Sequence, residues 1–116
     1  TPEETQQVLV EKGSLQYKVE EFTDEAVVKI SGWALNRKTL RAGTLNIVLT
    51  GQDKQQYIVK SERLYRPDVR DAFGKRRLAF AGFEAAFIKQ NLPKQHYEVS
   101  LVLDGDARMV GSIVVA

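Results

Sequence analysis

The chain contains no cysteine, one histidine and one tryptophan among its 116 residues. Without cysteine it can form no disulfide, no thiolate metal site and no thiol nucleophile. The only histidine, His96, excludes a metal site built from several histidines, and no nucleophile motif accompanies it. The chain also lacks an apolar stretch near the roughly 20 residues that span a bilayer, and it shows no signal-peptide pattern.

Other kinds of site are missing as well. The turn Asp104-Gly105-Asp106 lacks the further ligands and the acidic twelfth position of a calcium loop. Glu20 and Glu21 are neighbours on an expected strand, so their carboxylates point to opposite faces and cannot work as an acid/base pair. No glycine-rich phosphate loop is present. We therefore expect no cofactor, no metal and no catalytic residue, and we expect that the domain itself is not an enzyme.

The composition is that of an ordinary globular domain, with 43% hydrophobic and 28% charged residues and a net charge of +2. Residues 1–13 are polar and rich in glutamine and glutamate, which predicts a linker or a disordered lead-in. Residues 14–116 are predicted to form a single domain. This mild basicity does not by itself indicate nucleic acid as a partner.

From Leu15 onward the hydrophobic residues recur with a period of two, which is typical of half-buried strands. Turn residues separate the strands at regular intervals, which predicts an all-β fold, an Ig-like β-sandwich of about seven antiparallel strands. The expected strands run from Leu15, over 26–35, 44–50, 56–63 and 77–87, from Tyr97 to Leu103, and over 108–115. A helix competes only at 84–91, where the alternation and Pro93 favour a strand.

The box Arg66-Pro67-Asp68-Val69 interrupts the strand pattern and carries the best signal for a short helical turn, near 69–74. Proline fixes φ and pushes the residue before it into an extended conformation, which would leave Asp68 as the N-cap. Gly74 suits the position that ends such a turn. The favoured interpretation is a structural crossover with Arg66 in an ion pair. The alternative is that Arg66 or Asp68 contacts a ligand.

Gly32 and Trp33 form a second box, within Ile30-Ser31-Gly32-Trp33-Ala34-Leu35. A glycine inside a strand often marks a bulge or a close approach of another backbone. A lone tryptophan in a small sandwich is more often a core residue, although an exposed one could stack on a sugar ring. A core position for Trp33 is therefore favoured over a sugar platform.

Basic residues are concentrated between residues 63 and 77, with Tyr65 and Phe73 interleaved. Guanidinium groups bind phosphate in a bidentate manner, so this stretch could hold an anionic polymer, an anionic membrane or RNA. The alternative is a solvated loop with weak local ion pairs. Nucleic acid is disfavoured because no matching motif is present. The candidate anion-binding residues are Arg63, Arg66, Arg70, Lys75, Arg76 and Arg77.

The two boxes and the pair Gly82-Phe83, in this order, resemble a bacterial Ig-like accessory domain. In that family a strand with the sequence GWA precedes an RPDV crossover, and a GF strand follows. Such domains are attached to cell-wall hydrolases and to enzymes that build surface polysaccharides or teichoic acids. The resemblance covers roughly residues 25–105, and it brings no catalytic residues with it.

The resemblance implies a non-catalytic accessory domain of a larger cell-envelope protein, such as a glycosyl- or glycerophosphotransferase. Its partners would be the other domains of that protein, and it would reach a membrane only through them. An extracytoplasmic location is favoured over the cytoplasmic face of the membrane. The second hypothesis is a module that binds carbohydrate or an anionic cell-wall polymer through the surface of residues 63–77.

Overall fold

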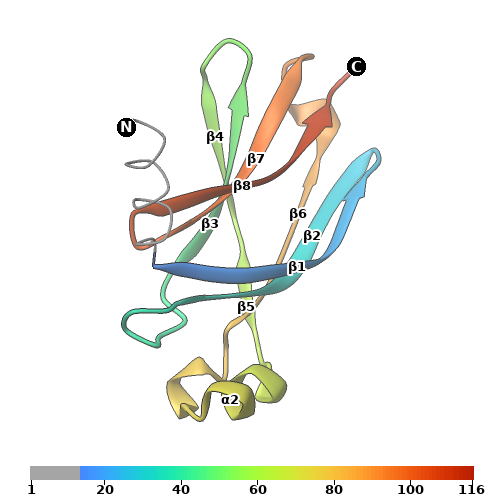
Figure 1. Cartoon of the computed structure of the whole chain (residues 1–116). Coiled ribbons are helices and arrows are strands. Elements are labelled where there is room, and N and C mark those ends of the chain that lie inside the picture. Colours follow the sequence, from blue (N-terminus) through green and yellow to red (C-terminus); the bar gives the residue numbers. More distant parts are fainter. Residues whose placement is uncertain (1–13) are drawn as a thin grey trace, which may run out of the picture.

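Two four-stranded antiparallel sheets lie face to face in the computed structural model, which describes residues 14–116 (Figure 1). The linker predicted for residues 1–13 lies outside the described residues. The first sheet has the order β1-β2-β6-β5, with β1 (Leu15–Asp24), β2 (Val27–Asn36), β6 (Gly82–Ile88) and β5 (Glu62–Leu64). The second has the order β4-β3-β7-β8, with β4 (Gln56–Lys60), β3 (Leu45–Gly51), β7 (His96–Leu103) and β8 (Asp106–Val114).

This strand order confirms the predicted all-β sandwich. It is the order of an immunoglobulin-like sandwich. In the seven-strand form of that fold, the first, second, fifth and fourth strands share one sheet. Here β1, β2, β6 and β5 take those places, and β4 is an extra strand in the other sheet. Tyr97, at the start of β7, donates its hydroxyl to the carbonyl of Pro93 at 2.6 Å. The same bond, from a tyrosine near this strand's start to the backbone just upstream, recurs in immunoglobulin-like domains.

The main core lies between the sheets and is built by the period-two pattern. Val28 and Ile30 of β2 are fully buried, which fits the period-two pattern of the strand expected over 26–35. In β7 four alternate residues of the expected strand are all buried in the core between the sheets. These four residues are Tyr97, Val99, Leu101 and Leu103.

The predicted fourth strand, over 56–63, is wrong as a single element. It is two strands, because the chain leaves the second sheet after β4 and enters the first sheet as β5. Ser61 stands at the crossing point, where its hydroxyl donates to the carbonyl of Leu45 at 2.7 Å. This division explains why the sandwich has eight strands where seven were predicted.

The predicted strand over 77–87 begins five residues later than expected. Residues Arg76–Leu78 form a 3-10 turn, η1, and β6 starts only at Gly82. The turn places Leu78 in a buried position outside the main core. The ambiguous segment 84–91 is a strand as far as Ile88, and a 3-10 turn, η2 (Lys89–Asn91), follows it.

Gly32 lies opposite an irregularity in β1. The β1–β2 pairing passes from Val19–Gly32 to Glu21–Ser31, so Glu20 is an extra residue that forms a β-bulge. A Cβ atom on Gly32 would overlap the carbonyl oxygen of Lys18. Both meanings expected of a glycine at this position, a bulge and a close backbone approach, are therefore confirmed.

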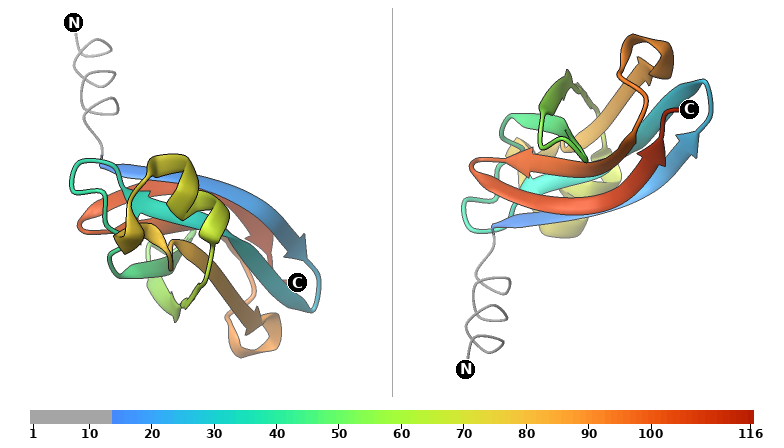
Figure 2. Two further views of the ribbon diagram at one scale, coloured as in Figure 1. Left: turned by 90° about the horizontal axis from the view of Figure 1, so that it is seen from below. Right: turned by 90° about the horizontal axis from the view of Figure 1, so that it is seen from above.

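A short helix, α2 (Pro67–Phe73), and η1 lie together at one end of the sandwich, on the first sheet (Figures 1 and 2). They cover a second apolar cluster on the outer face of that sheet, separate from the main core. Its buried members are Leu35, Val69, Leu78 and Ala81, with Trp33 and Phe73 partly buried against them. Within residues 14–116 no helix is long and apolar enough to cross a bilayer.

Candidate functional site

The three sequence boxes meet in space around the β2–β6 pair. Gly32 pairs with Phe83 and Trp33 pairs with Gly82, so the GWA and GF boxes lie side by side. A Cβ atom on Gly82 would come within 2.6 Å of the Arg66 Cγ, so this glycine makes room for the side chain of Arg66. The boxes therefore form one structural unit.

Arg66 is the polar centre of this unit, and its guanidinium group holds two carboxylates at once. Nη1 and Nη2 donate to the two oxygens of Glu20, at 2.5 and 3.1 Å. Nε and Nη2 donate to the two oxygens of Asp68, at 2.9 and 2.8 Å. Glu20 is the bulge residue of β1, so the ion pair ties the first strand to the start of α2. The predicted ion pair of Arg66 is confirmed, and its donors are engaged within the fold.

The ionisation of both carboxyl groups reflects this arrangement. Hydrogen bonds from Arg66 lower the pKa of the Glu20 carboxyl below its ordinary value of 4.5. The same guanidinium group, acting chiefly through its hydrogen bonds, lowers the pKa of Asp68 to about 2. In turn, the two carboxylates raise the pKa of Arg66 above its already high range. All three groups are charged at neutral pH.

The predicted role of Asp68 as N-cap is wrong. The cap position belongs to Arg66, Pro67 is the first helical residue, and no side chain caps this helix. Proline is common at the first helical position, which moves the cap one residue upstream of it. The predicted end of the helix is confirmed: Gly74 has φ 65°, and its N–H bonds to Asp71 O while that of Lys75 bonds to Arg70 O.

Arg63, another predicted anion ligand, points into the structure. Its guanidinium group donates to the carbonyl of Ala81 at 2.9 Å and also to the carbonyl of Ala42. It thereby joins the loop after β2 to the start of β6. Burial lowers the pKa of Arg63 to about 10, so the group is still charged at neutral pH. Its donors bind backbone oxygens, which leaves little for a ligand.

Trp33 lies outside the main core, on the outer face of the first sheet. It is half-buried there under α2, and its ring meets that of Phe73 edge-on, with centroids 6.2 Å apart. Trp33 is therefore a packing residue of the second apolar cluster. The predicted core position is wrong, because Trp33 is only partly buried and packs against the smaller cluster on the outer face of the sheet.

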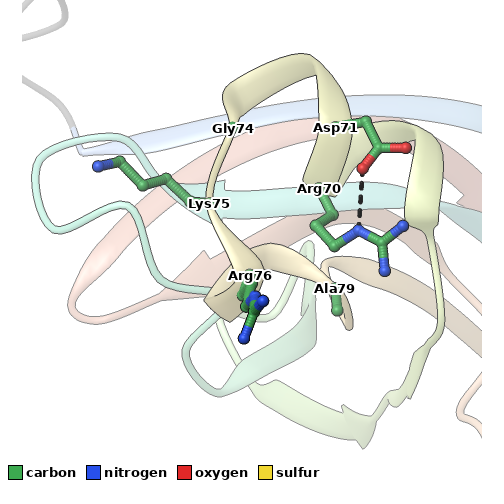
Figure 3. A pocket seen from close by; sticks show the side chains of 6 residues that line it. All are labelled: Arg70, Asp71, Gly74, Lys75, Arg76 and Ala79. Carbon is green, nitrogen blue, oxygen red and sulfur yellow. Dashed lines mark hydrogen bonds and ion pairs between the residues drawn. The ribbon is translucent and has the colours of Figure 1, made fainter.

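The second half of the basic stretch faces solvent. Arg70, Lys75 and Arg76 line a shallow depression of about 690 Å³ between α2 and η1, together with Asp71, Gly74 and Ala79 (Figure 3). Arg70 donates to Asp71 at 3.0 Å. Lys75, Arg76 and Arg77 are exposed and make no ion pair or side-chain hydrogen bond within residues 14–116. We call this surface, from Arg70 to Arg77, the basic end.

The loop after β2 adds to the positive charge of the same end. Residues 37–41 contain Arg37, Lys38 and Arg41, and the loop lies beside η1 at the end of the sandwich that carries α2 (Figure 2). Asn36 shapes this loop: its side-chain oxygen accepts from the backbone N–H groups of Lys38 and Thr39, at 3.0 and 3.1 Å. Two basic segments that are distant in the sequence therefore share one pole.

Sequence reasoning missed one exposed feature beside the basic end. Tyr65 and Phe80 are 53% and 57% exposed, and their ring centroids lie 5.6 Å apart. The alternation of the sequence places Phe80 in the strand expected over 77–87 and gives no sign of its exposure. Only the pairing of residues before α2 with residues after η1 brings the two rings together, and no local signal reports such a pairing.

The described residues include no group of acidic or histidine side chains that could hold a metal ion. What the geometry offers is a cationic surface beside exposed aromatic rings, on a scaffold fixed by the three boxes. No family model, curated protein or solved structure matches this chain, so its function must be argued from this geometry.

Proposed function

We propose that this domain is a non-catalytic accessory module of a larger bacterial cell-envelope protein, one involved in surface polysaccharide or teichoic acid metabolism. One observation carries the proposal: the residues of the sequence boxes are engaged in contacts within the fold. Arg66 holds Glu20 and Asp68, and Gly32 and Gly82 make room for backbone and side chain. Such residues maintain a fold and leave interaction to the surface around them.

The nature of the parent protein rests on the resemblance of the boxes to bacterial Ig-like accessory domains. An antibody raised against the chain tests it directly in the organism's fractionated lysate. The expected result is a band far larger than the 13.1 kDa of this chain, enriched in the envelope fraction. A band near 13.1 kDa in the soluble fraction would contradict the proposal.

The second candidate function is binding of an anionic cell-wall polymer, and the basic end favours it. Three exposed cations lie there without a partner in the described part of the chain, close to the basic loop after β2. Like charges repel, so their concentration at one pole weakens the fold unless something compensates it. An anionic polymer would supply that compensation through several phosphate contacts.

Retention of the purified chain on immobilised poly(glycerol phosphate) tests this second function. Retention should weaken steeply as salt rises, because exposed charges are screened. Arg76→Glu should abolish most of it. Lys94→Glu is the matched control, since Lys94 is exposed in the connection before β7, at the opposite end from α2. Equal loss for both variants would mean attraction by net charge alone and would count against a specific surface.

A further inference from the structure

Two exposed aromatic rings adjoin the basic depression, on the surface between β5, α2 and η1. The backbone N–H of Arg66 donates to the carbonyl of Ala79 at 2.6 Å, which brings the residues flanking the helices side by side. Tyr65 and Phe80 are neighbours for this reason, and their rings are tilted by 55°. More than half of each residue is in contact with solvent. Exposed apolar surface that is grouped in this way often marks a binding site.

Arg70 belongs both to the aromatic pair and to the basic end. Its guanidinium carbon lies 5.8 Å from the centre of the Tyr65 ring, and Nη1 donates to the Tyr65 hydroxyl at 2.9 Å. The same side chain lines the depression with Lys75 and Arg76. Ala79, which also lines the depression, directly precedes Phe80 in the sequence. The rings and the cations are therefore adjoining parts of one surface.

We propose that this surface binds a phosphate-bearing sugar unit of a polymer. The C–H face of the sugar ring packs on Phe80 and Tyr65, and the phosphate is held over the depression by the cations of the basic end. This inference rests on the proposed binding of an anionic polymer and names the unit that is recognised. Arginine suits the phosphate because its planar group offers paired donors.

The arrangement fits a sugar better than a nucleobase. Proteins that hold single-stranded nucleic acid stack successive bases on successive aromatic faces along a basic groove. Here a single pair of rings is present, and the 55° tilt prevents both rings from presenting parallel faces to flat bases. A sugar ring is thick and non-planar, so it can rest in the angle between two tilted rings. The carboxylate of Asp71, at the edge of the depression, can accept from a sugar hydroxyl.

The test is an amide chemical-shift titration of the chain with inorganic phosphate, glucose 1-phosphate and an oligothymidylate, at one low salt concentration. Glucose 1-phosphate should bind about tenfold more tightly than inorganic phosphate, because only the sugar reaches the rings. Its shifts should include Tyr65 and Phe80 as well as Arg70 and Arg76. Inorganic phosphate should shift the basic residues alone.

Two variants with matched controls separate the contributions. Phe80→Ala should reduce the affinity for glucose 1-phosphate to that for inorganic phosphate, which itself should not change. Ile58→Ala removes an even more exposed apolar side chain from β4, at 68% exposure, and should alter neither affinity. Arg76→Glu should lower the affinity for both ligands, and Lys94→Glu should lower the affinity for neither.

Three results would overturn the inference, and they differ in whether the proposed binding of an anionic polymer survives. Equal affinities for inorganic phosphate and glucose 1-phosphate would remove the sugar contact and leave binding of an anionic polymer intact. Absence of binding by any anion would remove both. Tighter binding of the oligothymidylate, with shifts at Tyr65 and Phe80, would assign the surface to single-stranded nucleic acid.

Discussion

The two halves of the basic stretch are both rich in arginine, but their cations have different surroundings. In residues 63–68 the guanidinium groups of Arg63 and Arg66 bind carbonyls and carboxylates of the domain itself. In residues 70–77 the cations face solvent, and three of them make no ion pair with a described residue. A row of positive charges in a sequence therefore does not define one surface. The first half holds the scaffold together, and the second half is available to a partner.

The difference follows from where each half lies. The first half runs through β5 into the start of α2, beside the bulge of β1 and the GF box, where carboxylate and carbonyl oxygens are close. The second half runs along α2 and η1, and the only acidic side chain of these two elements after Asp68 is that of Asp71. Substitutions can therefore separate the two halves, with large effects on stability in the first and effects on binding in the second.

The largest expected effect on stability comes from adding a Cβ atom to Gly32, which lies opposite the bulge. Gly32→Ala should lower the free energy of unfolding by about 3 kcal/mol or more, because the new Cβ would overlap backbone that cannot move aside. Chemical denaturation measures this. Gly74→Ala is the matched control: nothing lies within 4 Å of its new Cβ, and only the left-handed φ of 65° adds strain, about 1 kcal/mol. Equal losses would show that Gly32 is not sterically required.

The next largest effect should come from Arg66. Arg66→Met keeps the length of the side chain and removes the bonds to Glu20 and Asp68. It should lower the free energy of unfolding by about 1–2 kcal/mol, a modest value because the pair is partly solvated. Thermal unfolding measures it. A loss as small as that of Arg76→Met would contradict the distinction between the two halves.

The ion pairs also predict how stability depends on pH. The pKa values of Glu20 and Asp68 are lower in the folded chain than in the unfolded chain. Their contribution is therefore complete above pH 4.5, the higher of the two ordinary values, and is lost as pH falls toward 2. Denaturation midpoints between pH 5 and pH 2 should fall less steeply in Arg66→Met than in the wild type. Parallel curves for the two proteins would show that Arg66 does not set these pKa values.

The smallest effect on stability should come from the second half. Arg76→Glu should change the free energy of unfolding by less than about 0.5 kcal/mol, because the side chain is exposed and unpaired within the described residues. The same variant should lose retention on the anionic matrix. A variant that unfolds more easily while its retention is unchanged would reverse the assignment of the two halves.

Much of the fold could be predicted from sequence because a half-buried strand has a local signature. Val28 and Ile30 alternate with polar residues, and each lies in the core as expected. The switch between sheets at Ser61 has no such signature. Tyr57, Val59 and Arg63 continue the same alternation across it, so the pattern looks like one strand even though its halves pair with different neighbours.

The candidate site was predictable in part. The sequence indicated Gly32, Arg66 and Gly74 from their backbone and charge chemistry, and the structure gives each of them a contact or conformation of the expected kind. The fate of each cation depends on residues far away in the sequence: Glu20 is 46 positions from Arg66. Phe80 was missed for the same reason, since only the fold brings it to Tyr65.

The bulge in β1 changes whether the odd-numbered or the even-numbered residues of the strand face the core. Before it, the odd-numbered residues Tyr17 and Val19 pack against the core, and after it the even-numbered Phe22 does so. Deleting one residue at the bulge would place all three core residues at alternate positions of a regular, unbroken strand. It would also remove the contact between Glu20 and Arg66. The irregularity is thus a one-residue insertion that an alternating strand does not need for its core. Its consequence is a carboxylate on the outer face, at the place where the crossover helix begins.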